Sequence, residues 1–71
     1  MILWERARSS NIEKVGYDTE TKELQVQFHS GAVYRYAGVP QDIYEDFKEV
    51  GYSGRFLNST IKGAYDYERI G

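Results

Sequence analysis

The sequence has 71 residues, with nine Lys and Arg against eleven Asp and Glu and a formal net charge of −2 at pH 7. This length is enough for one domain with a thin core, and the acidic balance argues against a strongly basic nucleic-acid binder while leaving room for a local patch. The absence of Cys excludes disulfides and thiol chemistry, and no apolar run approaches the ~18 residues of a membrane span, so we expect a cytoplasmic protein with no membrane partner.

The first residues along the chain have only a weak hydrophobic period. Trp4 is the notable residue of the segment 1–8, and we expect it to dock as a lid or as an edge strand. A polar turn at Ser9–Asn11 follows. Residues Ile12–Asp18 are predicted to form the first central strand, and Gly16 within it indicates a bulge or a close approach to the backbone.

A hairpin between Leu24 and Val39 organises the chain, and its loop length decides where two tyrosines point. A two-residue loop at Ser30–Gly31 would leave Tyr34 and Tyr36 on the wet face. A three-residue loop over residues 29–31, with a left-handed glycine, pairs Phe28 with Ala32 and turns both rings toward the core. We favour the second register because it unites the large apolar groups, and a one-residue slip would reverse every side chain. The opposite face then carries Gln25, Gln27, Val33 and Arg35.

Two helices are predicted after the hairpin. The first follows Pro40 and runs from about Gln41 to Val50, with an inward stripe at helical spacing. Ser53 is a candidate N-cap for the second, from about Gly54 to Lys62. The tail alternates tyrosines with acids, as a short strand or an extended segment would. The expected fold is α+β: a three-stranded, or four-stranded, antiparallel sheet with two short C-terminal helices packed on one face, in a single domain over residues 1–71. The inward residues are Ile43, Tyr44, Phe47 and Val50 in the first helix and Phe56, Leu57, Thr60 and Ile61 in the second.

Catalytic groups are scarce in this composition. His29 is the only histidine, and it falls at the exposed tip of the hairpin, where a Ser–His nucleophile pair has no support. One His and no Cys cannot supply the usual ligands of zinc. The carboxylates of the first helix are expected to form a solvated face. We therefore expect no enzyme activity, no metal and no cofactor.

One polar group is a candidate binding surface. Arg55, Asn58 and Lys62 fall at i, i+3 and i+7 of the second helix and therefore share a face. Arg and Lys bind phosphate, and Asn reads a base edge or a backbone group. Arg35 on the outer face of the sheet is expected to extend this patch, and exposed tyrosines would stack on unpaired bases. The plainer alternative is an ordinary polar helix face.

Several short motifs together carry a family resemblance. They are Ser-Ser-Asn-Ile at 9–12, Gly-Tyr-Asp at 16–18, Phe28 with Gly31, Tyr-Arg-Tyr at 34–36, Val-Pro at 39–40, Tyr44, and Ser-Gly-Arg-Phe at 53–56 with Asn58 and Ile61. In their order and spacing the chain resembles the KTSC domain, a module found at the C-terminus of some lysyl-tRNA synthetases and as a small separate protein. The likeness covers residues 9–65. Tyr34, Tyr36 and Asn58 match motif positions, no catalytic residue is implied, and the synthetase context implies RNA binding.

Three functions remain open from the sequence. The first is a module that binds RNA or tRNA through Arg35, Arg55, Asn58 and Lys62, with Tyr34 and Tyr36 at the rim of the site. The second is a protein-interaction module that docks a larger partner on Trp4 and the outer face of the sheet. The third is a small nucleotide binder. We expect a monomer or a weak dimer, because an unpaired edge strand would support self-association.

Overall fold

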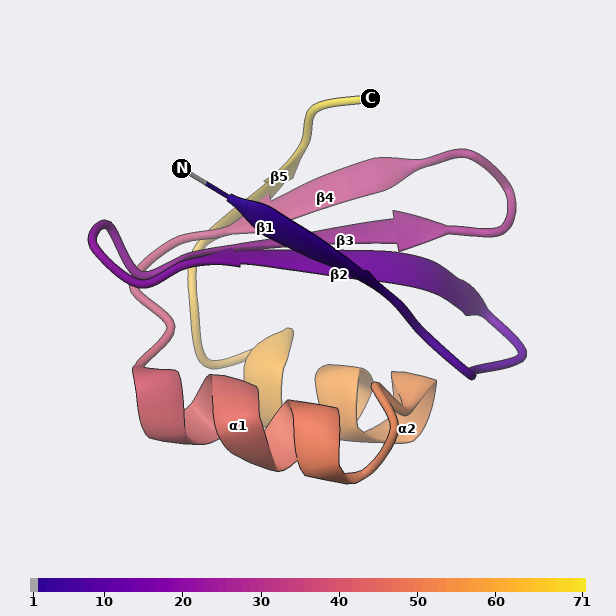
Figure 1. Cartoon of the computed structure of the whole chain (residues 1–71). Helices are drawn as coiled ribbons and strands as arrows, with labels where there is room; N and C mark the ends of the chain where they lie inside the picture. Colours follow the sequence, from indigo (N-terminus) through magenta and orange to yellow (C-terminus); the bar gives the residue numbers. More distant parts are fainter. Residues whose placement is uncertain (1) are drawn as a thin grey trace.

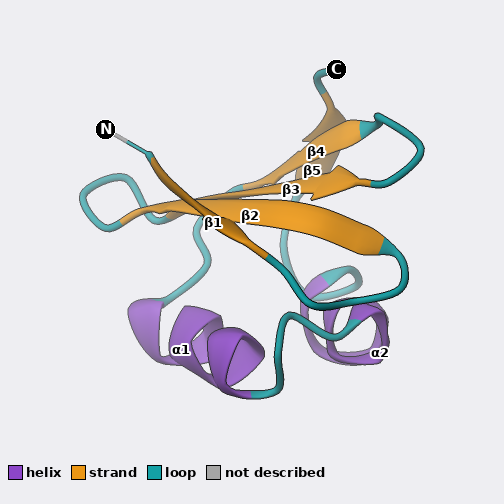
Figure 2. Ribbon diagram, turned by 45° about the vertical axis from the view of Figure 1, so that its right-hand side comes forward, coloured by secondary structure: helices purple, strands orange, loops and turns teal. Residues whose placement is uncertain are grey.

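The computed structural model describes residues 2–71, which form an antiparallel sheet covered on one face by helices (Figure 1). The sheet has five strands in chain order, each paired with the next. Helical segments lie together beneath one face, and the other face is open (Figure 2). The strands are β1 (Leu3–Arg6), β2 (Ile12–Asp18), β3 (Glu23–Phe28), β4 (Val33–Tyr36) and β5 (Tyr67–Arg69), and the helices are α1 (Gln41–Glu49), α2 (Gly54–Phe56) and the π-helical η1 (Leu57–Ile61).

The predicted α+β class and antiparallel sheet are confirmed, but the predicted number of strands is wrong. Trp4 lies in β1, which pairs with β2 as an edge strand. The tail returns to the sheet as β5 beside β4, so the helices precede a final strand and are not C-terminal. Both added strands are short and wholly exposed. Their own patterns are weak because pairing with a neighbouring strand, rather than burial, holds them in place.

The three-residue register of the central hairpin is confirmed. Tyr36 lies opposite Leu24, and Tyr34 lies opposite Val26. Gly31 donates its N–H to the carbonyl of Phe28 at 2.9 Å and has a φ of +97°. That backbone conformation is open to glycine and strained for other residues, so Gly31 fixes the loop that turns both tyrosines toward the helices.

The core lies between the sheet and the helices. Phe47 of α1 is fully buried and stacks on Phe56 with ring centroids 5.7 Å apart. Tyr17 of β2 is also buried, and its hydroxyl donates to the carbonyl of Val39. Aromatic side chains thus supply much of the contact area that a chain of this size needs. The other core residues are Ala7, Ile12, Val15, Leu24, Val26, Tyr36, Val39, Tyr52, Leu57 and Ile61.

The end of α1 departs from the predicted apolar stripe. Val50 is half exposed, because α1 ends at Glu49 and the chain reverses at Gly51, where φ is +71°. The N–H of Gly51 bonds the carbonyl of Lys48, and the N–H of Tyr52 bonds that of Phe47, which is a Schellman ending. This reversal buries Tyr52 in the place predicted for Val50.

The second helix begins where predicted, and its last turns are wider than those of an α-helix. The Ser53 side chain accepts from the N–H of Arg55 at 3.2 Å, which confirms the N-cap. The N–H of Lys62 bonds the carbonyl of Leu57, five residues back, as in a π-helix. Leu57 and Ile61 are buried, whereas Asn58 and Lys62 are exposed. Within residues 2–71, none of the helices has both the length and the apolar character needed to cross a membrane.

The first strands confirm the close approach predicted at Gly16. The Trp4 ring lies over this glycine, and a Cβ added there would meet Trp4 at 2.9 Å and Ile2 at 2.4 Å. The register shift of β2 lies earlier, between Ile12 and Lys14. The Lys14 amine lies 5.1 Å from the centre of the Trp4 ring, a cation–π distance. Gly16 therefore makes room for an aromatic ring on the open face of the sheet.

Candidate functional site

A hollow of about 420 Å³ lies between the β3–β4 hairpin, β5 and η1. This volume is within the range of small-molecule pockets, and its walls combine aromatic rings, polar groups and positive charge. The lining residues are Phe28, Ser30, Ala32, Tyr34, Tyr36, Asn58, Lys62 and Arg69. We call it the hairpin–helix hollow.

Two cations reach the hollow from separate elements. Arg69 of β5 is paired in register with Tyr34 of β4, so both side chains leave the sheet on its helical face. Lys62 comes from the end of η1. Within residues 2–71, neither cation lies within 4 Å of an Asp or Glu carboxylate, and no acidic side chain lines the hollow, although the Arg69 Nε donates to the backbone oxygen of Gly71. Their charges are therefore available to an anion.

The aromatic rings of the hollow have different exposures. Tyr36 is only 2% exposed, so its ring belongs to the core and only its edge reaches the hollow. Burial raises the pKa of Tyr36 to about 12, so its hydroxyl is neutral near pH 7 and does not repel an anion. Tyr34 is half-buried and meets Phe28 edge-to-face, with centroids 5.8 Å apart and planes at 87°. Tyr34 and Phe28 are thus the rings that a ligand can contact.

The structure brings together four of the six predicted site residues, namely Tyr34, Tyr36, Asn58 and Lys62. Arg55 is exposed on α2 but does not line the hollow. The grouping expected from the second helix is therefore found in part.

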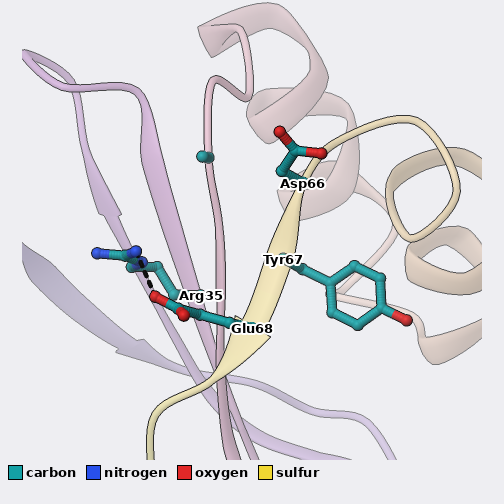
Figure 3. A pocket seen from close by; sticks show the side chains of 5 residues that line it. Arg35, Asp66, Tyr67 and Glu68 are labelled. Atoms are coloured by element: carbon teal, nitrogen blue, oxygen red, sulfur yellow. Dashed lines mark hydrogen bonds and ion pairs between the residues drawn. The ribbon is translucent and has the colours of Figure 1, made fainter.

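Arg35 does not extend the patch, and this expectation was wrong. It lies between Tyr34 and Tyr36 on β4, so strand alternation sends its side chain to the open face, away from the helices. Its guanidinium forms ion pairs with Glu68 and, at 3.8 Å, with Glu23. Figure 3 shows Arg35 and Glu68 side by side, with the Tyr67 ring pointing away from them. The arginine that was expected to bind phosphate is therefore already paired with two carboxylates.

Arg69 and Phe28 are functional candidates that the sequence analysis missed. Arg69 lies in the tail, for which the sequence predicts a short strand or an extended segment but no partner strand. The available signal was the spacing of Tyr67 and Arg69, because residues two apart on a strand share a face. In the structure the Arg69 Nε donates to the carbonyl of Gly71 at 2.8 Å, which holds the guanidinium near β4.

A second polar cluster joins β1 to the end of α1. The buried Tyr52 hydroxyl donates to the Glu5 carboxylate and accepts from Tyr44 at 3.2 Å, and Lys48 lies 3.5 Å from the same carboxylate. The hydrogen bond from Tyr52 lowers the pKa of Glu5, and burial raises the pKa of Tyr52. Each of these polar groups has a partner, so the cluster is a structural link between strand and helix. Across residues 2–71 no group of His, Asp or Glu side chains is arranged to hold a metal ion.

Comparison with known proteins identifies relatives along most of the chain. Residues 8–65 match the KTSC domain. An uncharacterized protein of Stutzerimonas stutzeri is 41% identical over 64 residues, covering 89% of this chain and 90% of that protein. A lysine–tRNA ligase of Nostoc punctiforme is 32% identical over 65 residues, which are 92% of this chain and 12% of the ligase. The crystal structure of a KTSC domain protein from Yersinia pestis matches all of both chains with 33% identity and a TM-score of 0.90.

Proposed function

This chain belongs to the KTSC domain family, and from that premise we propose that it is a non-enzymatic module that binds single-stranded RNA in the hairpin–helix hollow. The observation that carries the proposal is that Lys62 and Arg69, neither of which has an Asp or Glu partner within residues 2–71, line the same hollow as the half-buried Tyr34 ring. Cations bind phosphate, and an aromatic ring stacks on an unpaired base. The lysine–tRNA ligase that contains a similar segment supports an RNA partner.

The hollow suits a single strand better than a duplex. RNA duplexes present their backbone over a broad surface, whereas unpaired bases enter pockets and stack on aromatic side chains. Tyr34 and Phe28 line the hollow, and Asn58 there offers an amide with both a donor and an acceptor. A single strand could place one base against the Tyr34 ring and one or two phosphates on Lys62 and Arg69.

Salt dependence gives a quantitative test of the proposal. Two phosphate contacts on a single strand predict that log K falls with log salt with a slope of about −1.4. Titration of a fluorescein-labelled single-stranded RNA, followed by anisotropy at low salt, measures both K and the slope. Lys62→Glu and Arg69→Glu should each lower the affinity by about tenfold, or ~1.4 kcal/mol.

Lys22→Glu is the matched control for these charge reversals. Lys22 lies in the β2–β3 turn, at the end of β3 opposite to Phe28, and it changes the net charge by the same amount. At 0.1 M salt it should leave the RNA affinity within about twofold, because exposed charges farther apart than the Debye length of ~10 Å at that salt are screened. Equal losses in Lys22→Glu and Lys62→Glu, or no RNA binding by the wild type at low salt, would refute the proposed site.

The open face of the sheet favours a second candidate function, the docking of a partner protein. Trp4 of the edge strand is 42% exposed on this face, and helices cover only the other face of the sheet (Figure 1). The substitution Trp4→Ala should abolish the binding of a partner protein to this face, whereas it should leave RNA binding in the hollow unchanged. Loss of RNA binding in Trp4→Ala, with retention in Lys62→Glu, would place the RNA on the open face instead.

A further inference from the structure

A second hollow adjoins the first at the tip of the hairpin. It measures about 370 Å³ and lies between the β1–β2 connection, which supplies Ser10 and Asn11, and the β3–β4 turn, which supplies His29. Phe28 and Ser30 line both hollows, so the two meet at these side chains. We call this the hairpin-tip hollow.

Hydrogen bonds hold the walls of the hairpin-tip hollow in place. The N–H of His29 donates to the carbonyl of Asn11 at 3.0 Å, and its ring Nε2 donates to the carbonyl of Ser9 at 3.2 Å. These bonds tie the end of β3 to the chain before β2. The Asn11 side chain makes no hydrogen bond within residues 2–71, so its amide has both a donor and an acceptor to offer.

The two hollows have different charge. Lys62 and Arg69 make the hairpin–helix hollow positive, whereas no Lys or Arg lines the hairpin-tip hollow. The Glu13 carboxylate lies 3.7 Å from the His29 ring, at the edge of this second hollow. A phosphate would find no cation there and one nearby acid, so the hairpin-tip hollow suits an uncharged polar ring.

We propose that the hairpin-tip hollow is a subsite for a second base, so that the protein holds two consecutive nucleotides of an RNA strand. The inference rests on the proposed function. The linking phosphate lies on Lys62 and Arg69, the second base passes Phe28, and the Asn11 amide hydrogen-bonds its edge. Asn pairs with base edges through its donor and acceptor together, so this subsite also gives base preference.

Ligand length tests the inference. The probes are the four ribonucleoside 5′-monophosphates and the 5′-phosphorylated ribodinucleotides of the same base, titrated into the ¹⁵N-labelled protein. Dinucleotides should bind about tenfold more tightly than mononucleotides for the preferred base. They should shift the amide signals of Ser10 and Asn11, whereas mononucleotides shift those of Lys62 and Arg69 alone.

Two variants separate this inference from the proposed function. Asn11→Ala should remove most of the tenfold gain of dinucleotides and weaken the base preference, with mononucleotide binding unchanged within about twofold. Gln41→Ala, which removes an exposed amide from α1, is the matched control and should change neither. Circular dichroism checks that both variants fold.

Each outcome of this experiment decides one of the two proposals. If dinucleotides bind no better than mononucleotides and Asn11→Ala has no effect, the subsite is refuted, while loss of RNA binding in Lys62→Glu would still support the first hollow. If Lys62→Glu leaves RNA binding intact, the proposed function itself fails. If Asn11→Ala lowers mononucleotide and dinucleotide binding equally, Asn11 belongs to the first base site and the two-base reading is wrong.

Discussion

Gly31→Ala tests the backbone feature that places both tyrosines. Gly31 has a φ of +97°, and a Cβ added there would touch nothing within 4 Å, so the substitution introduces backbone strain without a steric clash. A left-handed conformation costs a non-glycine residue ~1–2 kcal/mol. A domain of 71 residues is expected to have about 4–11 kcal/mol of stability, so the variant should still fold. For a domain this small, the loss corresponds to a fall in Tm of about 4–16 °C.

Gly63→Ala is the matched control for this prediction. A Cβ at Gly63 also meets nothing within 4 Å, but its φ lies outside the left-handed region, so Ala there should be neutral or stabilising by up to ~1 kcal/mol. Urea unfolding followed by far-ultraviolet circular dichroism compares the two variants. Equal stability of Gly31→Ala and Gly63→Ala would refute the claim that the left-handed residue limits the loop.

Two further predictions concern the contacts between sheet and helices. Phe47→Ala should lower the free energy of unfolding by ~3–5 kcal/mol, because this ring is fully buried between Phe56 and Tyr52. Urea unfolding should find the variant marginally folded or unfolded. A loss below ~1 kcal/mol would contradict the packing. Tyr52→Phe should remove the hydrogen bond that lowers the pKa of Glu5. A pKa that is lowered in the folded state stabilises the fold at pH values above the ordinary 4.5, and this stabilisation is lost as the pH falls through the folded pKa. Unfolding curves of the wild type and Tyr52→Phe should therefore differ at pH 7 and converge in acid.

Local patterns were enough to predict the centre of the fold. The strand at Ile12–Asp18 has the predicted bounds, and the hairpin has the predicted register. In both, one side of the strand must be apolar, and a slip by one residue would expose the whole set, so the sequence allows few alternatives. The helices begin at the residues that the Pro40 and Ser53 signals indicated.

The edges of the sheet could not be predicted in the same way. β1 and β5 have four and three residues, and none of them is buried. An exposed edge strand has no face buried in the core, so its sequence shows no alternation of apolar and polar residues. Its bonds come from the neighbouring strand, as where the N–H of Ile70 bonds the carbonyl of Val33 beside β5. Such pairing depends on where the chain returns after the helices, and no local signal contains that information.

The tail was predicted as a short strand or an extended segment, and its unpredicted pairing with β4 explains the error at the candidate site. The preferred register already placed Arg35 on the face opposite to Tyr34, so Arg35 could not lie beside Lys62 below the sheet. An arginine of the sheet can reach the helical face only from a position whose side chain points to the same side as Tyr34 and Tyr36. Arg69 has such a position because β5 pairs it with Tyr34. If the sequence had indicated that the tail pairs with β4, Arg69 would have been predicted as the site residue in place of Arg35.

The net charge of −2 is compatible with an anion site because no acidic side chain within residues 2–71 lines the hollow, and several of the acids are paired with cations elsewhere. Glu5 lies beside Lys48, and Glu23 and Glu68 hold Arg35 on the open face. These cations offset two of the three carboxylates at short range, and at 0.1 M salt the remaining charge is screened beyond about 10 Å. Lys62 is not neutralised in this way within residues 2–71, and its partner in the hollow, Arg69, is not either. Affinity for phosphate therefore depends on which cations lack acids, and the total charge of the chain does not report it.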